Sequence, residues 1–144
     1  MGEKHTAIKR RITFFAYGIT AIISVILGSI YLFSPQFMPY HSAAIGVEWA
    51  VLSSETQVLY LALLRVAGGG WIGIGVAMMI LLWIPYRRKE GWASGAIAAV
   101  GLIFYLPTLY ATVLVTVNTP ATAPWYGNVA AVASLLIGFA LTRK

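Results

Sequence analysis

The chain has 144 residues, of which 60% are hydrophobic and 10% are charged, whereas soluble domains contain roughly 25% charged residues. Its mean hydropathy is +0.82. A soluble protein of this length cannot hide so much apolar surface, so lipid is the expected solvent for most of the chain. These values exclude a water-soluble enzyme, a nucleic-acid-binding protein and a disordered chain as descriptions of the whole molecule.

Chemically reactive side chains are scarce. The sequence contains no Cys and no Asp, but four Glu and two His, which excludes disulfides, thiolate metal sites and thiol nucleophiles. His5 and His41 are expected on opposite sides of the membrane, so they cannot share a metal ion. We therefore expect no metal site, no cofactor and no catalytic residue, and a non-catalytic role is favoured over an enzyme.

Four apolar runs cover residues 12–33, 55–84, 92–117 and 125–141. Each is long enough to cross a bilayer, and backbone groups in lipid must be satisfied within the segment, which indicates helices. We predict one membrane domain over residues 1–144, an all-α integral membrane protein with an up-down four-helix transmembrane bundle. Residues 34–54 form the outer loop, in which residues 42–52 are expected to lie as a short interfacial helix. Ser54 and Gln57 are expected to cap the second span.

Basic residues predict the orientation of these spans. Lys and Arg gather at 4–11, at 87–89 and at 143–144, and the other two connections contain neither. By the positive-inside rule, the N- and C-termini are both cytoplasmic. We therefore expect the net charge of +6 to interact with the membrane surface and not with a nucleic acid.

Small and polar residues recur every three or four positions in each span, which predicts the helix faces that meet. The expected stripes are Tyr17, Thr20, Ser24, Gly28 and Tyr31 in span one; Ala62, Arg65, Gly69, Gly73 and Ala77 in span two; Ser94, Ala98, Gly101, Tyr105, Thr108 and Thr112 in span three; and Gly127, Ala131, Ser134 and Gly138 in span four. Gly69 with Gly73, and Gly91 with Gly95, are small-xxx-small pairs. They serve either packing inside the bundle or a homodimer face.

Arg65 is the candidate functional residue, because an arginine inside a span is costly unless it is paired. Glu48 in the outer loop is its expected partner, and Glu55 is a second acidic candidate. Pro107 has no N–H group, so the Ile103 carbonyl loses its helical partner and could accept from Arg65. Tyr105 and Thr108 are expected at about the same depth, because span three runs antiparallel to span two. Two interpretations stay open: Arg65 fixes the loop to the bundle, or it binds an anion.

Residues 61–71, the Pro85-Tyr86-Arg87-Arg88 turn and residues 106–112 resemble a group of small bacterial four-span proteins of unassigned function. The resemblance covers spans two to four and implies the same topology, with Arg65 and the Gly68–Gly70 run as a recurring unit. It implies a bacterial inner (plasma) membrane location and supplies no activity. The helix layout is also similar to that of four-span scaffold proteins and of small quinone- or sterol-related membrane proteins, an analogy of fold alone.

The resulting functional prediction is a non-catalytic accessory or scaffold subunit that contacts partner helices or lipid. The expected partners are membrane lipids and either another membrane protein or a second copy of the chain. The alternative is binding or transport of a small amphipathic or anionic molecule in an outer-half pocket around Arg65, formed with Glu48, Tyr31, Tyr105 and Thr108.

Overall fold

The computed structural model describes residues 2–143, and the side chains of residues 4–143. In this range the chain is all helical: four long helices, one short α-helix, a 3₁₀ turn and a π-helical turn, with no strand. The elements are α1 (Gly2–Phe33), α2 (Pro39–Ile45), η1 (Trp49–Val51), α3 (Ser54–Leu81), η2 (Leu82–Tyr86), α4 (Ala93–Asn118) and α5 (Trp125–Thr142).

The four long helices match the predicted apolar runs. The segments Lys4–Phe33, Ser54–Tyr86, Ala93–Asn118 and Trp125–Thr142 are each long and apolar enough to cross a membrane. The all-helical class and the four candidate spans are therefore confirmed. The second span is longer than expected because η2 extends α3 through Pro85 to Tyr86.

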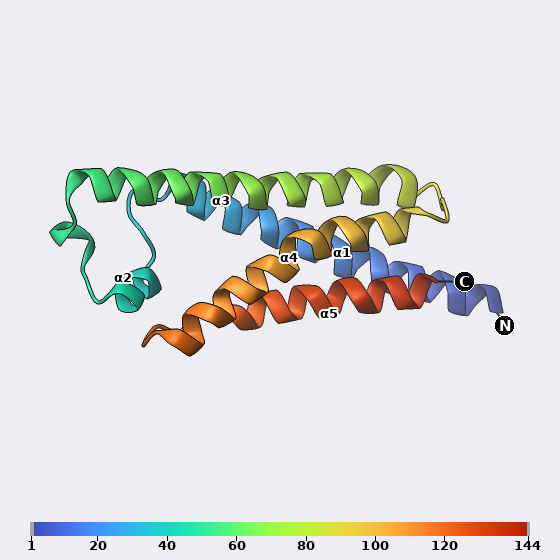
Figure 1. Ribbon diagram of the computed structural model, residues 1–144. Helices are drawn as coiled ribbons and strands as arrows, with labels where there is room; N and C mark the ends of the chain where they lie inside the picture. Colours follow the sequence, from blue (N-terminus) through green and yellow to red (C-terminus); the bar gives the residue numbers. More distant parts are fainter. Residues whose placement is uncertain (1, 144) are drawn as a thin grey trace.

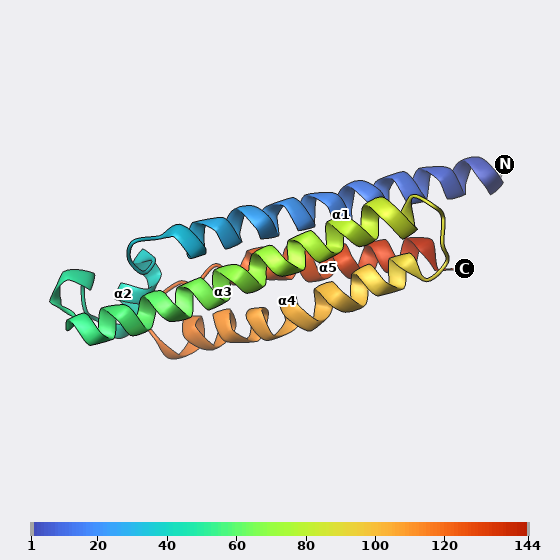
Figure 2. The same cartoon turned by 90° about the horizontal axis from the view of Figure 1, so that it is seen from above.

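Figures 1 and 2 show how the helices are arranged. Helices α1 and α3 lie side by side along most of their length, and α4 diverges from α3 to pack on α5. The start of α1 and the end of α5 lie at the same end of the molecule. The α3–α4 turn lies at this end too, whereas α2 and η1 lie at the opposite end, which we call the outer end.

Glycines let α1 and α3 approach closely. A Cβ atom at Gly68 would lie 2.6 Å from the Leu32 nitrogen and 2.7 Å from the Gly28 oxygen, and one at Gly75 would lie 2.7 Å from the Ala21 oxygen. No side chain fits at these positions. In lipid, where burial of apolar surface does not select an interface, such backbone proximity does.

The interior face of α3 differs from the expected stripe. Its buried residues are Leu64, Gly68, Trp71, Gly75 and Met78, whereas Ala62, Arg65, Gly69 and Gly73 are exposed. At 100° per residue, the centre of the contact face lies roughly 160° around the helix axis from the centre of the expected stripe, nearly on the opposite side of the helix. The three consecutive glycines at 68–70 point to different sides of the helix. Only Gly68 contacts the backbone of α1.

The other predicted packing glycines divide into two groups. Gly101 and Gly138 are buried at helix contacts, where a Cβ would lie 2.7 Å from Leu135 and 2.5 Å from Tyr17, and Gly95 faces Phe139 at 3.6 Å. Gly91 lies exposed in the turn before α4, and like Gly69 and Gly73 it has no atom within 4 Å of an added Cβ. In the part of the chain that the structure describes, these three glycines therefore do not mark a close approach of two helices.

The core combines apolar side chains with bonded hydroxyls. Tyr17, Met78, Ile97 and Leu135 are fully buried. The Tyr17 hydroxyl lies 3.1 Å from Ser94 Oγ and donates to the Leu135 carbonyl at 3.4 Å, so it joins α1 to α4 and α5. Among the described side chains, no buried nitrogen or oxygen lacks a hydrogen-bond partner, as a lipid-embedded bundle requires.

The outer segment differs from the prediction in detail. The expected helix over residues 42–52 is replaced by α2 and η1, separated by Gly46 in the left-handed region at φ +68°. The cap of α3 is Ser53, whose Oγ accepts from the Thr56 N–H, and not Ser54. The Gln57 side chain donates back to the Trp49 and Leu52 carbonyls and so fastens the loop to the helix.

Candidate functional site

Arg65 lies on the exposed side of α3. Among the described residues, no hydrogen bond, ion pair or ring contact of the Arg65 side chain is found. The exposed residues one turn and two turns further along, Gly69 and Gly73, have no atom within 4 Å of an added Cβ. Arg65 is therefore a free cation beside a flat strip of helix backbone.

Glu48 lies in the outer segment, where it precedes η1 and is exposed. It lines a cavity of about 590 Å³ together with Gln36, Phe37, Pro39, Ser42, Ala43, Gly46, Trp49 and Ala50. Arg65 does not line this cavity. The expected Glu48–Arg65 pair is not formed among the described side chains.

Phe37 holds the outer segment against the bundle. It is 5% exposed, and its ring meets Trp49 at 4.9 Å and Tyr60 at 5.4 Å in edge-on contacts. Such aromatic pairs each contribute about 0.5–1.5 kcal/mol beyond the buried area. The outer segment is thus anchored by an aromatic cluster, and not by Arg65 as one of the two interpretations of the sequence proposed.

Tyr31 and Tyr40 form a hydrogen-bonded pair, with their hydroxyl oxygens 2.6 Å apart. Burial, followed by this hydrogen bond, raises the pKa of Tyr40 above its ordinary value. The neighbouring His41 Nδ1 accepts the Met38 N–H at 3.0 Å. Burial lowers the pKa of His41, so the imidazole stays neutral and keeps its role as acceptor.

Tyr105 and Thr108 have partners inside the bundle. The Tyr105 hydroxyl is 2.7 Å from Ser24 Oγ, and Thr108 Oγ1 donates to the Phe104 carbonyl at 2.8 Å. Ile103 and Pro107 are exposed, and no hydrogen bond joins the Ile103 carbonyl to the Arg65 side chain. Of the five residues of the expected pocket, only Glu48 lines the cavity of about 590 Å³ at the outer end.

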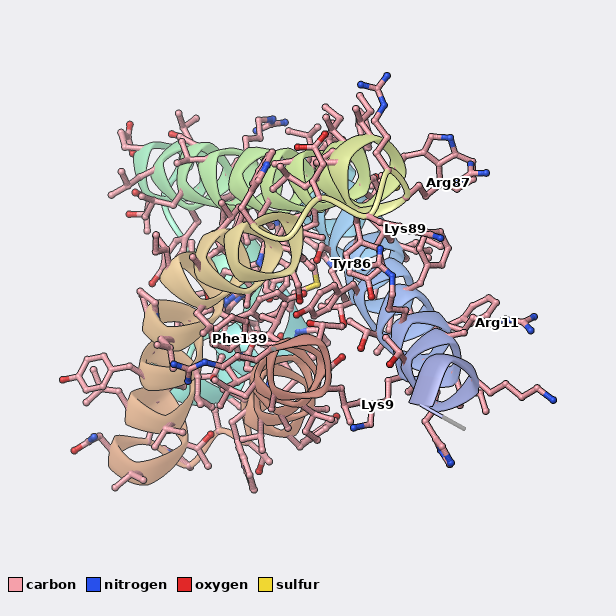
Figure 3. All side chains as sticks on the ribbon, turned by 90° about the vertical axis from the view of Figure 1, so that its right-hand side faces the viewer. Lys9, Arg11, Tyr86, Arg87, Lys89 and Phe139 are labelled. Carbon is pink, nitrogen blue, oxygen red and sulfur yellow. The ribbon has the colours of Figure 1, made fainter. Side chains whose placement is uncertain are left out.

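Two basic clusters meet at the end opposite the outer segment (Figure 3). Arg10 on α1 donates through Nη2 to the Tyr86 carbonyl at 2.6 Å, and the Tyr86 hydroxyl donates to the Arg10 carbonyl at 3.0 Å. Both clusters of Lys and Arg are visible in the sequence, where they predict the orientation of the spans and no binding site. Nothing in the sequence indicated that the clusters would touch.

The part of the chain that the structure describes contains no group of three His, Asp or Glu able to hold a metal ion. No family model, curated protein or solved structure matches this chain.

Proposed function

We propose that this protein is an accessory subunit of a membrane complex, which docks through one face of α3 onto a transmembrane helix that carries an acidic side chain. The observation that supports this most directly is the unpartnered Arg65 beside Gly69 and Gly73 on the exposed side of an apolar helix. We call this exposed surface, consisting of Ala62, Arg65, Gly69 and Gly73, the α3 docking face.

The membrane placement proposed here has four spans, with both chain ends and the α3–α4 turn in the cytoplasm of a bacterial cell. It is supported by the basic residues, which gather at 4–11, 87–89 and 143–144. Cytoplasmic connections carry this excess of Lys and Arg. The outer segment then faces the opposite side of the membrane.

The depth of Arg65 makes a partner favourable. Arg65 is about 27 Å along the helix axis from Trp83, at 1.5 Å per residue, and exposed Trp side chains prefer the membrane interface. With Trp83 at the inner interface, Arg65 lies just inside the outer boundary of a hydrocarbon core about 30 Å thick. A charge there costs less than at the centre of the span, where the cost is about 2.5–3.5 kcal/mol. A carboxylate partner would offset this cost.

The glycines support a helix as the partner. Gly69 and Gly73 remove side chains from the surface next to Arg65, so a second helix can approach the backbone closely. Close helix packing at Gly69 and Gly73 and the pairing of Arg65 with a carboxylate would then stabilise the same interface. A stripe of glycines alone would serve a second copy of this chain equally well; the unpaired arginine is what favours an acidic partner.

The alternative proposal, binding of a small anionic or amphipathic molecule around Arg65, has less support. Tyr31, Tyr105 and Thr108 are each hydrogen-bonded elsewhere, and the cavity beside Glu48 is not lined by Arg65. This function therefore remains an outcome of the test.

The test is native mass spectrometry of the protein extracted gently from its own membrane. We expect a second membrane protein at fixed stoichiometry, lost in Arg65→Leu and Gly69→Leu. Ala67→Leu is the matched control, because Ala67 is also exposed but points about 160° away from Arg65 around the helix. Complex formation should survive in this control variant.

A charge exchange then tests the acidic partner directly. Arg65→Glu should abolish the complex, and replacing the partner's acidic residue by Lys should restore it. A complex that persists in both Arg65→Leu and Gly69→Leu would overturn the proposal. A small anionic adduct on the monomer, lost in Arg65→Leu, would replace it by the ligand-binding function.

A further inference from the structure

The basic end of the molecule contains a small, shallow cavity of about 210 Å³, open to the surface, between α1 and the α3–α4 turn. It is lined by Arg10, Arg11, Phe14, Tyr86, Arg87 and Lys89. Four of these six side chains are cations and none is an acid. Glu90, the neighbouring carboxylate in the turn, accepts a hydrogen bond from Trp92 Nε1 at 2.7 Å and does not line the cavity.

Two of the four cations are held in position by aromatic rings. The Arg10 guanidinium lies 4.8 Å from the centre of the Tyr86 ring, and that of Arg87 lies 4.6 Å from the centre of the Trp83 ring. Arg10 uses one donor on the Tyr86 carbonyl, and a guanidinium has five N–H groups. Cations fixed in this way lose less conformational entropy when they bind an anion.

Lys89 is brought to the cavity by an unusual backbone conformation. Its φ is +63°, the only positive value at a residue other than glycine in the described chain. The Lys89 N–H donates to the Tyr86 carbonyl at 3.0 Å, the same oxygen that accepts from Arg10. A left-handed conformation costs an ordinary residue about 1–2 kcal/mol, and such strain is concentrated at functional sites.

The wall on the membrane side of the cavity is apolar. The Phe14 ring lines the cavity and packs against Trp83 and Tyr86 at 6.2 and 6.3 Å. Phe15 and Trp83 are 60% and 63% exposed and continue this surface along the helices. A ligand with a charged head and hydrocarbon chains would contact both parts, whereas a free ion would contact only the cations.

We propose that this cavity binds the phosphate groups of an anionic lipid whose head group carries two negative charges. Guanidinium groups recognise phosphate oxygens through paired N–H donors, and basic pockets between transmembrane helices bind such head groups. Four cations without a carboxylate favour a doubly charged head over a singly charged one. The adjacent aromatic surface favours a lipid over free phosphate.

The experiment titrates the full-length protein in detergent with cardiolipin, with phosphatidylglycerol or with inorganic phosphate, and counts bound ligands by native mass spectrometry. We expect one tightly held cardiolipin, weaker binding of phosphatidylglycerol, and no displacement of cardiolipin by inorganic phosphate. Displacement by millimolar phosphate would overturn the lipid assignment. Equal affinity for cardiolipin and phosphatidylglycerol would overturn the proposed preference for a head group with two negative charges.

Two double variants of equal charge test whether the cavity itself is responsible. Arg11→Gln with Lys89→Gly removes two lining cations without touching the Arg10–Tyr86 contact. Lys9→Gln with Arg88→Gln removes two exposed cations at the same end that do not line the cavity. We expect cardiolipin affinity at least about tenfold lower in the first variant than in the second, a difference of about 1.4 kcal/mol. Equal affinities would show unspecific surface attraction and overturn the proposal.

Discussion

The hydroxyl of Tyr105 donates to Ser24 Oγ at 2.7 Å, although 81 residues separate the two positions. The direction follows from the Ser24 proton, which is donated to the Thr20 carbonyl at 2.8 Å. The Tyr105 ring also meets Trp71 edge-on, at 5.3 Å between ring centres. These two buried contacts of Tyr105 thus connect α4 to both α1 and α3.

This geometry predicts an asymmetry between two conservative substitutions. Ser24→Ala leaves the buried Tyr105 hydroxyl without its acceptor, which costs about 1–3 kcal/mol of the free energy of unfolding. Tyr105→Phe leaves Ser24 bonded to Thr20, so only one interhelical hydrogen bond is lost, about 0.6 kcal/mol. Unfolding by sodium dodecyl sulfate from mixed micelles measures both. A greater loss in Tyr105→Phe than in Ser24→Ala would contradict this direction of the hydrogen bond.

Adjacent glycines in α3 should respond in opposite ways to the same substitution. Gly68→Ala places a methyl group 2.6 Å from the Leu32 nitrogen, so α1 and α3 must separate, at a cost of about 1–3 kcal/mol. Gly69→Ala meets no atom within 4 Å and gains up to about 1 kcal/mol from the higher helix propensity of Ala. The same unfolding measurement compares them. Similar stabilities of the two variants would exclude the α1–α3 contact described above.

The sequence predicted the helices and most of the buried residues on three of the four helix faces, because small and polar stripes mark helix interfaces in lipid. Gly127 in the fourth stripe is an exception, because it is exposed. Tyr17, Thr20, Ser24 and Gly28 are buried on α1 as expected. The predicted stripe is wrong on α3, because its polar residue does not face the bundle interior. Arg65 faces outwards, and the backbone approach at Gly68 and Gly75 decides the face.

The basic cavity could not be predicted, because it depends on how a turn is shaped. Arg10 and Tyr86 are 76 residues apart, and their contact requires both the π-helical turn η2 and the left-handed conformation of Lys89. A lysine gives no sequence signal for positive φ, whereas a glycine would have done so. The sequence shows both groups of basic residues, but it does not show that they line one cavity.

Acidification should loosen the outer segment through His41. Because burial lowers its pKa below the ordinary value of 6.5, the unfolded segment binds the proton first as the pH falls. The free energy of unfolding is therefore highest above pH 6.5, decreases below it, and stops decreasing below the lowered pKa. The protonated ring also cannot accept the Met38 N–H. Hydrogen exchange of residues 34–53, corrected for intrinsic rates, measures the effect between about pH 7.5 and 5.

The control for this pH dependence is His41→Gln in a His5→Gln background, so that no histidine remains. Exchange in this variant should vary with pH no more than the intrinsic rates require. If acidification accelerated hydrogen exchange equally with and without His41, another group would be responsible for the pH dependence. The Met38–His41 hydrogen bond would then have no role in it.

The backbone conformation at Lys89 predicts that glycine is the favoured residue there. Lys89→Gly relieves a left-handed conformation that costs about 1–2 kcal/mol, so the protein should be as stable as the wild type or more stable. Lys89→Val places a β-branched residue at positive φ, where it is a steric outlier, and should lose at least as much as glycine gains. Both variants remove one positive charge, so the comparison isolates the backbone. Unfolding from mixed micelles measures the difference, and equal stabilities would mean that residue 89 does not adopt positive φ.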